Sequence, residues 1–149
     1  DIQSITTFLQ QIEEDTDYIS FKNVEGTPAI RTHWGLFAEV VSRKALVKAH
    51  EATENHLEGA FYREHVTNYI YGHPEEFKLK LLEASEIIKN RNDLRFTIDT
   101  PEDFENMQRL FQIIEQEGGD FSLENLVRTT DKYPEIKKVM GEAIKKFNK

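Results

Sequence analysis

Hydrophobic residues recur at helical spacing in several segments of the chain. Ile5, Phe8, Leu9 and Ile12 are separated by polar residues, and this pattern predicts a short amphipathic helix that ends before Asp17. Further helices are predicted from the same spacing and from capping residues: after Ser42 to about His50, over 61–71, after Thr100 to about Gly118, after Ser122 and after Asp131. Residues 118–149 are therefore expected to form a helical extension.

Four strands are predicted between these helices. Residues 18–21 and 77–82 carry closely spaced apolar side chains of the kind that suits a pleated sheet. Residues 34–41 are mostly apolar, which is expected of a strand covered on both faces. Residues 23–33 show no hydrophobic period and contain glycine and proline, so this segment is predicted to be a loop.

The fourth predicted strand ends at an acidic residue. Within residues 94–98, Leu, Phe and Ile alternate with Arg and Thr, which is the period-two pattern of a half-buried strand. Asp99 follows directly, so its carboxylate is expected at the carboxyl end of this strand. Ligands of open α/β sheets collect at that edge, and the position suits a metal ion or a phosphate-bound cation.

A helix is predicted to start immediately after Asp99. Thr100 has the side-chain oxygen of an N-cap, and Pro101 suits the first helical position, where a backbone N–H would have no partner. Glu102 and Asp103 are first-turn acids that complement the helix dipole. Because Thr100 supplies the capping oxygen, the Asp99 side chain is not needed for the cap, which favours a functional role over a role in the turn.

The alternation of strands and helices predicts an α/β fold. The expected sheet is mixed and covered by helices, and it has few strands for a complete doubly wound domain. At 149 residues the chain is long enough for one domain with a sizeable core. We therefore expect a single domain over residues 1–149.

Composition excludes several classes of function. The net charge is −8, which argues against a nucleic-acid-binding surface, because phosphate contacts need a basic field. The chain contains no cysteine, so it has neither a disulfide framework nor a thiolate nucleophile, and a cytoplasmic location is favoured. No apolar run approaches the roughly 20 residues of a membrane span, so no membrane partner is expected.

Two further places could carry chemistry. Arg63, Glu64, His65 and Thr67 bring donors, an acid and an imidazole into about one helical turn, where an anionic sugar or a carboxylate could bind. A solvated helix start with an intrahelical ion pair explains the same residues equally well. Glu39 lies in an apolar stretch, so its carboxylate must be paired, exposed at a strand end or engaged with a ligand.

The five histidines do not have the spacing of a metal site. After His50 and Glu51, a helical zinc motif would require histidine at the position of Glu54. A surface or capping role is expected for His50, His56 and His73.

Residues 35–40, 63–71 and 94–103, taken together, resemble the carboxyl-terminal half of the cytidylyltransferase family. This family includes spore coat polysaccharide biosynthesis proteins of the glycosyltransferase-like type. It also includes the enzymes that activate acylneuraminate and 3-deoxy-manno-octulosonate with CTP. The resemblance extends over residues 1–117, and residues 118–149 carry no motif of the family.

The resemblance implies a partial nucleotide-diphosphosugar transferase fold, which is Rossmann-like. It also implies that a sugar hydroxyl attacks the α-phosphorus of CTP and releases pyrophosphate. Asp99 would be one of two acids that bind Mg²⁺, and Glu39, Arg63, Glu64 and His65 would lie near the sugar. No catalytic residue is assigned among these 149 residues.

The resemblance leads to two hypotheses. In the first, the chain is the carboxyl-terminal part of an enzyme that transfers CMP from CTP to a keto-sugar acid for surface polysaccharide biosynthesis. The glycine-rich triphosphate loop and the second acid would then lie in a longer chain. In the second, the chain is a noncatalytic sugar-binding or dimerisation module. An apolar strand in a small sheet favours a homodimer in either case.

Overall fold

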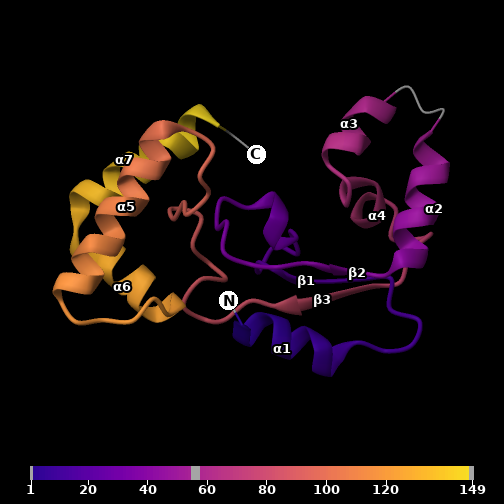
Figure 1. The fold of residues 1–149 in the computed structure, drawn as a ribbon, viewed down its shortest axis with the longest axis horizontal. Helices are drawn as coiled ribbons and strands as arrows, with labels where there is room; N and C mark the ends of the chain where they lie inside the picture. The colour runs from indigo at the N-terminus through magenta and orange to yellow at the C-terminus, as the bar shows by residue number, and fades with distance from the viewer. Residues whose placement is uncertain (1, 55–57, 148–149) are drawn as a thin grey trace. The chain divides into compact units, whose positions relative to one another are not determined.

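The computed structural model describes residues 2–54 and 58–147, and these fall into two compact units (Figure 1). The first unit comprises Asp1–Phe21 and Phe37–Leu82, and the second comprises Lys22–Leu36 and Glu83–Lys149. Each unit is therefore built from two separate stretches of the chain.

A three-stranded sheet has the order β2-β1-β3. Its strands are β1 (Tyr18–Lys22), β2 (Val40–Val41) and β3 (Leu79–Glu83). β1 and β2 are antiparallel, with Tyr18 opposite Val41. β1 and β3 run in the same direction, because Tyr18 N–H bonds to the Lys78 carbonyl near their starts and Ala84 N–H bonds to the Lys22 carbonyl at their ends. The sheet is therefore mixed, as predicted.

Helices cover both faces of β1 in the first unit (Figure 1). They are α1 (Ile2–Gln11), α2 (Arg43–Thr53), α3 (Gly59–Glu64) and α4 (Asn68–Gly72). Tyr18 packs in a core cluster with Ala45 of α2 and Ile70 of α4. Phe21 points to the opposite face, and its ring centroid lies 4.7 Å from that of Phe8 in α1.

The second unit has a short 3₁₀ turn, η1 (Ala29–Arg31), and three helices that pack together (Figure 1). The helices are α5 (Pro101–Gln116), α6 (Leu123–Lys132) and α7 (Pro134–Lys146). Their buried apolar side chains form much of the core of this unit: Met107, Leu110, Ile114, Leu126, Val127, Ile136 and Met140. The α/β fold class, with a small sheet, covering helices and a helical carboxyl-terminal part, is thus confirmed.

Several helix starts follow the capping signals in the sequence. Ser42 accepts a hydrogen bond from Ala45 N–H at the start of α2, and Ser122 caps α6 in the same way. Thr100 caps α5, and Pro101 occupies its first position. α5 ends at Gln116, shortly before the two glycines that were expected to close it.

Two of the predicted strands are wrong. Residues 34–41 contain only the two-residue β2, and residues 94–98 belong to no strand. Gly35 adopts a φ of +64°, which breaks the extended path of the first segment. In the second segment, Phe96 N–H bonds to the carbonyl of His33, so a loop takes the place of a neighbouring strand.

Two predicted helices have different boundaries. The helix expected over 61–71 is two helices, α3 and α4, because the backbone of His65 leaves the helical region at φ −113° and ψ 70°. The last helix begins at Pro134 and not after Asp131, which lies inside α6. Tyr133 precedes the proline in a nonhelical conformation, as the proline ring requires.

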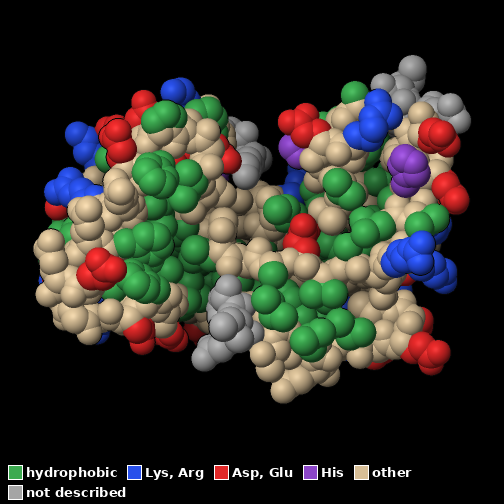
Figure 2. Space-filling view, viewed as in Figure 1, with side chains coloured by type: hydrophobic (Ala, Val, Ile, Leu, Met, Phe, Trp, Pro, Cys, Tyr) green, Lys and Arg blue, Asp and Glu red, His purple; other side chains and the backbone are tan. Residues whose placement is uncertain are grey.

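Apolar side chains remain exposed on both units, and some gather over α1 and over α5 and α6 in Figure 2. Leu9 is the most exposed of those on α1, and Phe111 contacts Phe121 with ring centroids 5.0 Å apart. Phe61 and Val66, within the segment 61–71, are also exposed. None of the helices within residues 2–54 and 58–147 has the length and hydrophobicity that a membrane crossing requires.

Candidate functional site

The acid that the sequence predicted as a metal ligand, Asp99, directly precedes the N-cap of α5. The Thr100 side chain accepts a hydrogen bond from Asp103 N–H, and Asp103 accepts from Thr100 N–H in return, which completes a capping box. Asp103 also accepts from Asp99 N–H at 3.1 Å. The backbone on both sides of the Asp99 side chain is therefore held in place.

Arg95 is buried in the second unit and binds both acids. Its Nε and Nη2 donate to the two carboxylate oxygens of Asp103, each at 2.9 Å, in a bidentate pair. Nη2 also donates to Asp99 Oδ2 at 2.8 Å. None of the Arg95 side chain is exposed, whereas half of the Asp99 side chain is. The period-two pattern placed Arg95 on the polar face of a strand, and the structure contradicts this.

His33 meets the same guanidinium from the other stretch of the second unit. Arg95 Nη1 lies 2.8 Å from His33 Nδ1. His33 also lines a polar cleft of about 240 Å³, together with Thr27, Arg31 and Asn92. Neither His33 nor Arg95 was predicted as a site residue. The available signal was a charged residue inside an apolar strand pattern, followed by acids four and eight residues later.

The Arg95 guanidinium sets the electrostatics of this group. Its hydrogen bonds, together with those from the Asp99 backbone and Thr100, lower the pKa of Asp103 to about 2, although partial burial acts in the opposite direction. The two carboxylates raise the pKa of Arg95 above its usual range. Both residues are therefore charged near neutral pH.

Acid is expected to destabilise the protein through Asp103. Its pKa is lowered from 3.8 to about 2 in the folded state, so its stabilising effect is complete above the unfolded value and is lost as the pH falls through the folded value. This lowering of the pKa corresponds to about 2 kcal/mol of stabilisation. Urea unfolding measures the free energy of unfolding of wild type and Asp103→Asn at about pH 6 and about pH 2. The difference in this free energy between the two proteins should be smaller at the lower pH. An equal difference at both pH values would contradict this assignment.

Asp99 keeps one carboxylate oxygen available. Oδ2 is bound by Arg95, and within the described ranges no donor bonds to Oδ1. The Asp99 side chain is half exposed, so Oδ1 can contribute one ligand to a Mg²⁺ ion that takes its other ligands from water and phosphate. Asp99 therefore fits the role of a single metal ligand.

Glu39 lies in the first unit and is paired. It accepts hydrogen bonds from the hydroxyl of Tyr18 and from the hydroxyl of Thr67, the latter at 3.2 Å. Burial and the neighbouring carboxylate raise the pKa of the Tyr18 phenol, so Tyr18 remains a donor. Of the outcomes expected for an acid in an apolar stretch, the structure shows the paired one.

Arg63, Glu64 and His65 lie at the end of α3, and all three are exposed. Arg63 lines a cavity of about 150 Å³ whose other walls include His50 and Tyr69. Within the described residues, neither Arg63 nor Glu64 forms an ion pair, so the structure does not show the intrahelical pair. Arg63 and Thr67 do not share a helical face, because α3 ends between them.

The predicted site residues belong to different units. Glu39 contacts Thr67, two residues beyond the end of the 63–65 group, and all of these residues are in the first unit. Asp99 is in the second unit, with Arg95 and His33.

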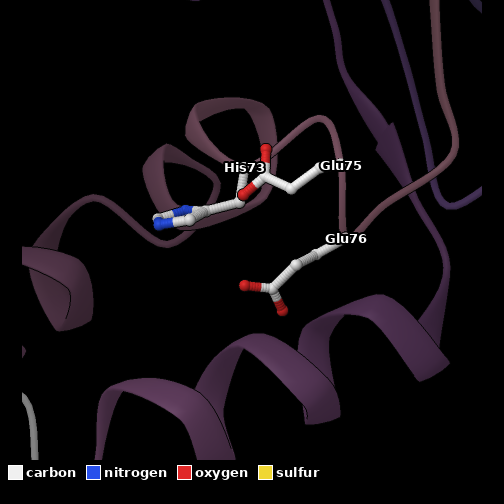
Figure 3. A group of neighbouring side chains, drawn as sticks. All are labelled: His73, Glu75 and Glu76. Carbon is white, nitrogen blue, oxygen red and sulfur yellow. The ribbon is translucent and has the colours of Figure 1, made fainter.

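A separate group of possible metal ligands consists of His73, Glu75 and Glu76 in the first unit (Figure 3). One ligand atom from each residue lies within 4.8 Å of the others. However, Lys48 Nζ lies 3.3 Å from a carboxylate oxygen of Glu76, and both acids are exposed. A cation would compete there with a lysine and with water.

The roles expected for the histidines can be compared with the structure. His73 is the C-cap of α4, and its Nδ1 lies 2.7 Å from the Tyr69 carbonyl, so the predicted capping role is confirmed. His50 is exposed in the last turn of α2, as predicted. His56 lies outside the described residues.

Two curated proteins are similar to the chain. Over 136 residues it is 32% identical to the uncharacterized protein MJ1063 of Methanocaldococcus jannaschii, and the matched region covers 89% of this chain and 52% of that protein. Over 103 residues it is 34% identical to the spore coat polysaccharide biosynthesis protein SpsF of Bacillus subtilis, and the matched region covers 68% of this chain and 40% of SpsF. The chain thus spans about half the length of these relatives or less. No protein-family model and no solved structure matches it.

Proposed function

We propose that this chain is the carboxyl-terminal part of a cytidylyltransferase that transfers CMP from CTP to a keto-sugar acid for surface polysaccharide biosynthesis. The observation that carries the proposal is Asp99: its half-exposed side chain has one available carboxylate oxygen, and its backbone directly before α5 is bonded to Asp103. The similarity to a spore coat polysaccharide biosynthesis protein supports the same conclusion.

In this proposal Asp99 Oδ1 contributes one ligand to Mg²⁺. The ion would neutralise charge that develops on the phosphates while the sugar hydroxyl attacks and pyrophosphate leaves. Arg95 occupies Oδ2, so the carboxylate can offer only Oδ1 outward. Asp103 holds the Asp99 backbone and Arg95 holds Oδ2, so the two bonds together restrain the position of Oδ1.

The first unit supplies the residues proposed to bind the sugar. Arg63 has no described partner for its guanidinium, which suits the carboxylate of a sugar acid. Glu39 accepts from two hydroxyl groups, and a sugar hydroxyl could replace that of Thr67. Glu64 and His65 are exposed beside Arg63 and can add polar contacts.

The test is pyrophosphate release by the longest natural protein that contains this chain. The assay contains CTP, Mg²⁺ and a panel of keto-sugar acids. Asp99→Asn keeps the size of the side chain but loses its charge, and it is expected to lower the rate by about 100-fold or more. Glu102→Gln changes an exposed acid three residues later, in the first turn of α5; it is the matched control and should retain activity.

Absence of pyrophosphate release with every sugar tested would contradict the enzyme proposal. Sugar binding by calorimetry in the same preparation, without any release, would then identify a noncatalytic module. Full activity of Asp99→Asn would remove Asp99 from the proposed metal site.

A further inference from the structure

Arg95 uses nearly all of its hydrogen-bonding capacity inside the second unit. A guanidinium has five N–H donors and no acceptor. Two of them bind Asp103, one binds Asp99 and one binds His33, at 2.8 to 2.9 Å. The Phe147 ring lies 5.3 Å from its central carbon. One buried cation thus joins Asp103 of α5 and Asp99, which precedes α5, to an imidazole from a distant stretch of the chain.

We propose that Arg95 is a positioning residue that fixes the orientation of the Asp99 carboxylate and the tautomer of His33, with Asp103 as its counter-ion. The effect of this orientation on metal binding by Asp99 rests on the proposed function. The tautomer of His33 depends only on the geometry of the second unit.

The tautomer of His33 follows from the chemistry of arginine. A guanidinium remains protonated in proteins and can only donate, so Nδ1 of His33 must accept the bond at 2.8 Å. The ring proton of the neutral imidazole is then on Nε2. Since His33 lines the polar cleft of about 240 Å³, its ring is set to be an N–H donor there and not an acceptor.

The orientation of Asp99 is set by two bonds. Arg95 Nη2 binds Oδ2, and Asp103 accepts the Asp99 backbone N–H. Without the guanidinium, the Asp99 side chain could rotate and offer either oxygen. Binding of a metal ion would then have to overcome the loss of this conformational entropy. Because Arg95 already restrains the side chain, less entropy is lost on binding.

Lysine cannot replace this arrangement. An ammonium concentrates its three donors on one atom, whereas the planar fork of Arg95 reaches three residues in different directions. Arg95→Lys therefore keeps the positive charge beside Asp103 and loses the geometry. This makes it the informative variant.

The first experiment reads the tautomer of His33 in the 149-residue chain by long-range ¹H–¹⁵N correlation spectra near neutral pH. In wild type, His33 should be protonated on Nε2 alone, and Arg95→Lys should give a mixture of both tautomers. Arg91→Lys is the matched control, since Arg91 also bonds two carboxylates, but those of Asp93 and Asp131, and not the pair that Arg95 holds. Its His33 spectrum should match wild type.

A proton on Nδ1 of His33 in wild type would overturn the proposal without any variant, so the test does not depend on whether Arg95→Lys folds. A folded Arg95→Lys protein with the wild-type His33 spectrum would also overturn it.

The second experiment measures the Mg²⁺ concentration for half-maximal pyrophosphate release in the longest natural protein containing the chain. Arg95→Lys should raise it about 10-fold, with a smaller change in the rate at saturating Mg²⁺. Glu102→Gln should leave it unchanged. An unchanged requirement in Arg95→Lys would overturn the role for Asp99. Absence of release in wild type would overturn the proposed function, while the His33 spectra would still decide the role of Arg95.

Discussion

Asp103→Ala is expected to lower the free energy of unfolding by about 3–5 kcal/mol. The substitution removes both carboxylate oxygens from the buried Arg95 and leaves it with Asp99, whose side chain is half exposed. It also removes the acceptor for the N–H groups of Asp99 and Thr100. Removing one member of a buried ion pair costs more than the pair contributes in net stability, because the buried Arg95 charge is then compensated only by a half-exposed carboxylate.

Urea unfolding followed by circular dichroism measures this loss. Glu102→Ala is the control, because Glu102 is an exposed acid one position earlier in α5, and it should change stability by about 0.5 kcal/mol or less. A double variant, Arg95→Met with Asp103→Leu, should recover much of the loss by removing both charges. A loss for Asp103→Ala no larger than for the control would mean that Arg95 finds other partners.

Gly35→Ala is expected to lower the free energy of unfolding by about 3 kcal/mol or more. Gly35 has a φ of +64°, and a Cβ atom there would lie 2.6 Å from the backbone nitrogen of Thr97 and 2.8 Å from its Cα. Backbone atoms cannot move aside as a flexible side chain can. The clash would push apart the segments around His33 and Arg95, which are joined by the bond from Phe96 N–H to the His33 carbonyl.

The matched control for this prediction is Gly118→Ala. Gly118 has a similar φ of +69°, but a Cβ atom there meets nothing within 4 Å. Gly118→Ala should lower the free energy of unfolding by about 1 kcal/mol, which is the cost of a positive φ for alanine without a steric clash. Thermal unfolding of both variants separates the two effects, and equal losses would show that Thr97 can give way. The Gly35 variant should also disturb the His33 spectrum, whereas the Gly118 variant should not.

Local signals in the sequence were sufficient for the element that carries the candidate site. The start of α5 was predicted to the residue, with Thr100 as its cap and Pro101 as its first residue. This is because a helix start is decided by groups within four residues of one another, which the sequence displays directly. The starts of α2 and α6 were predicted on the same basis, and the position of β1 was predicted from its closely spaced apolar residues.

The surroundings of Asp99 could not be predicted in this way. Period-two alternation assigns a polar side chain to solvent, but Arg95 points inward because Asp103 and His33 compensate its charge. Asp103 is eight residues away and His33 is 62 residues away. No local pattern indicates that such partners will meet, and without them a buried guanidinium would be too costly.

The sequence by itself determined the α/β class, the helix that begins at Pro101 and the acid that precedes it, because these depend on short-range hydrophobic periodicity and capping. Only the tertiary structure decided that residues 94–98 form no strand and that Asp99 offers one oxygen while Arg95 holds the other. It also brought His33 to the same guanidinium. These features depend on contacts between distant residues, whose desolvation and pairing energies outweigh local preference.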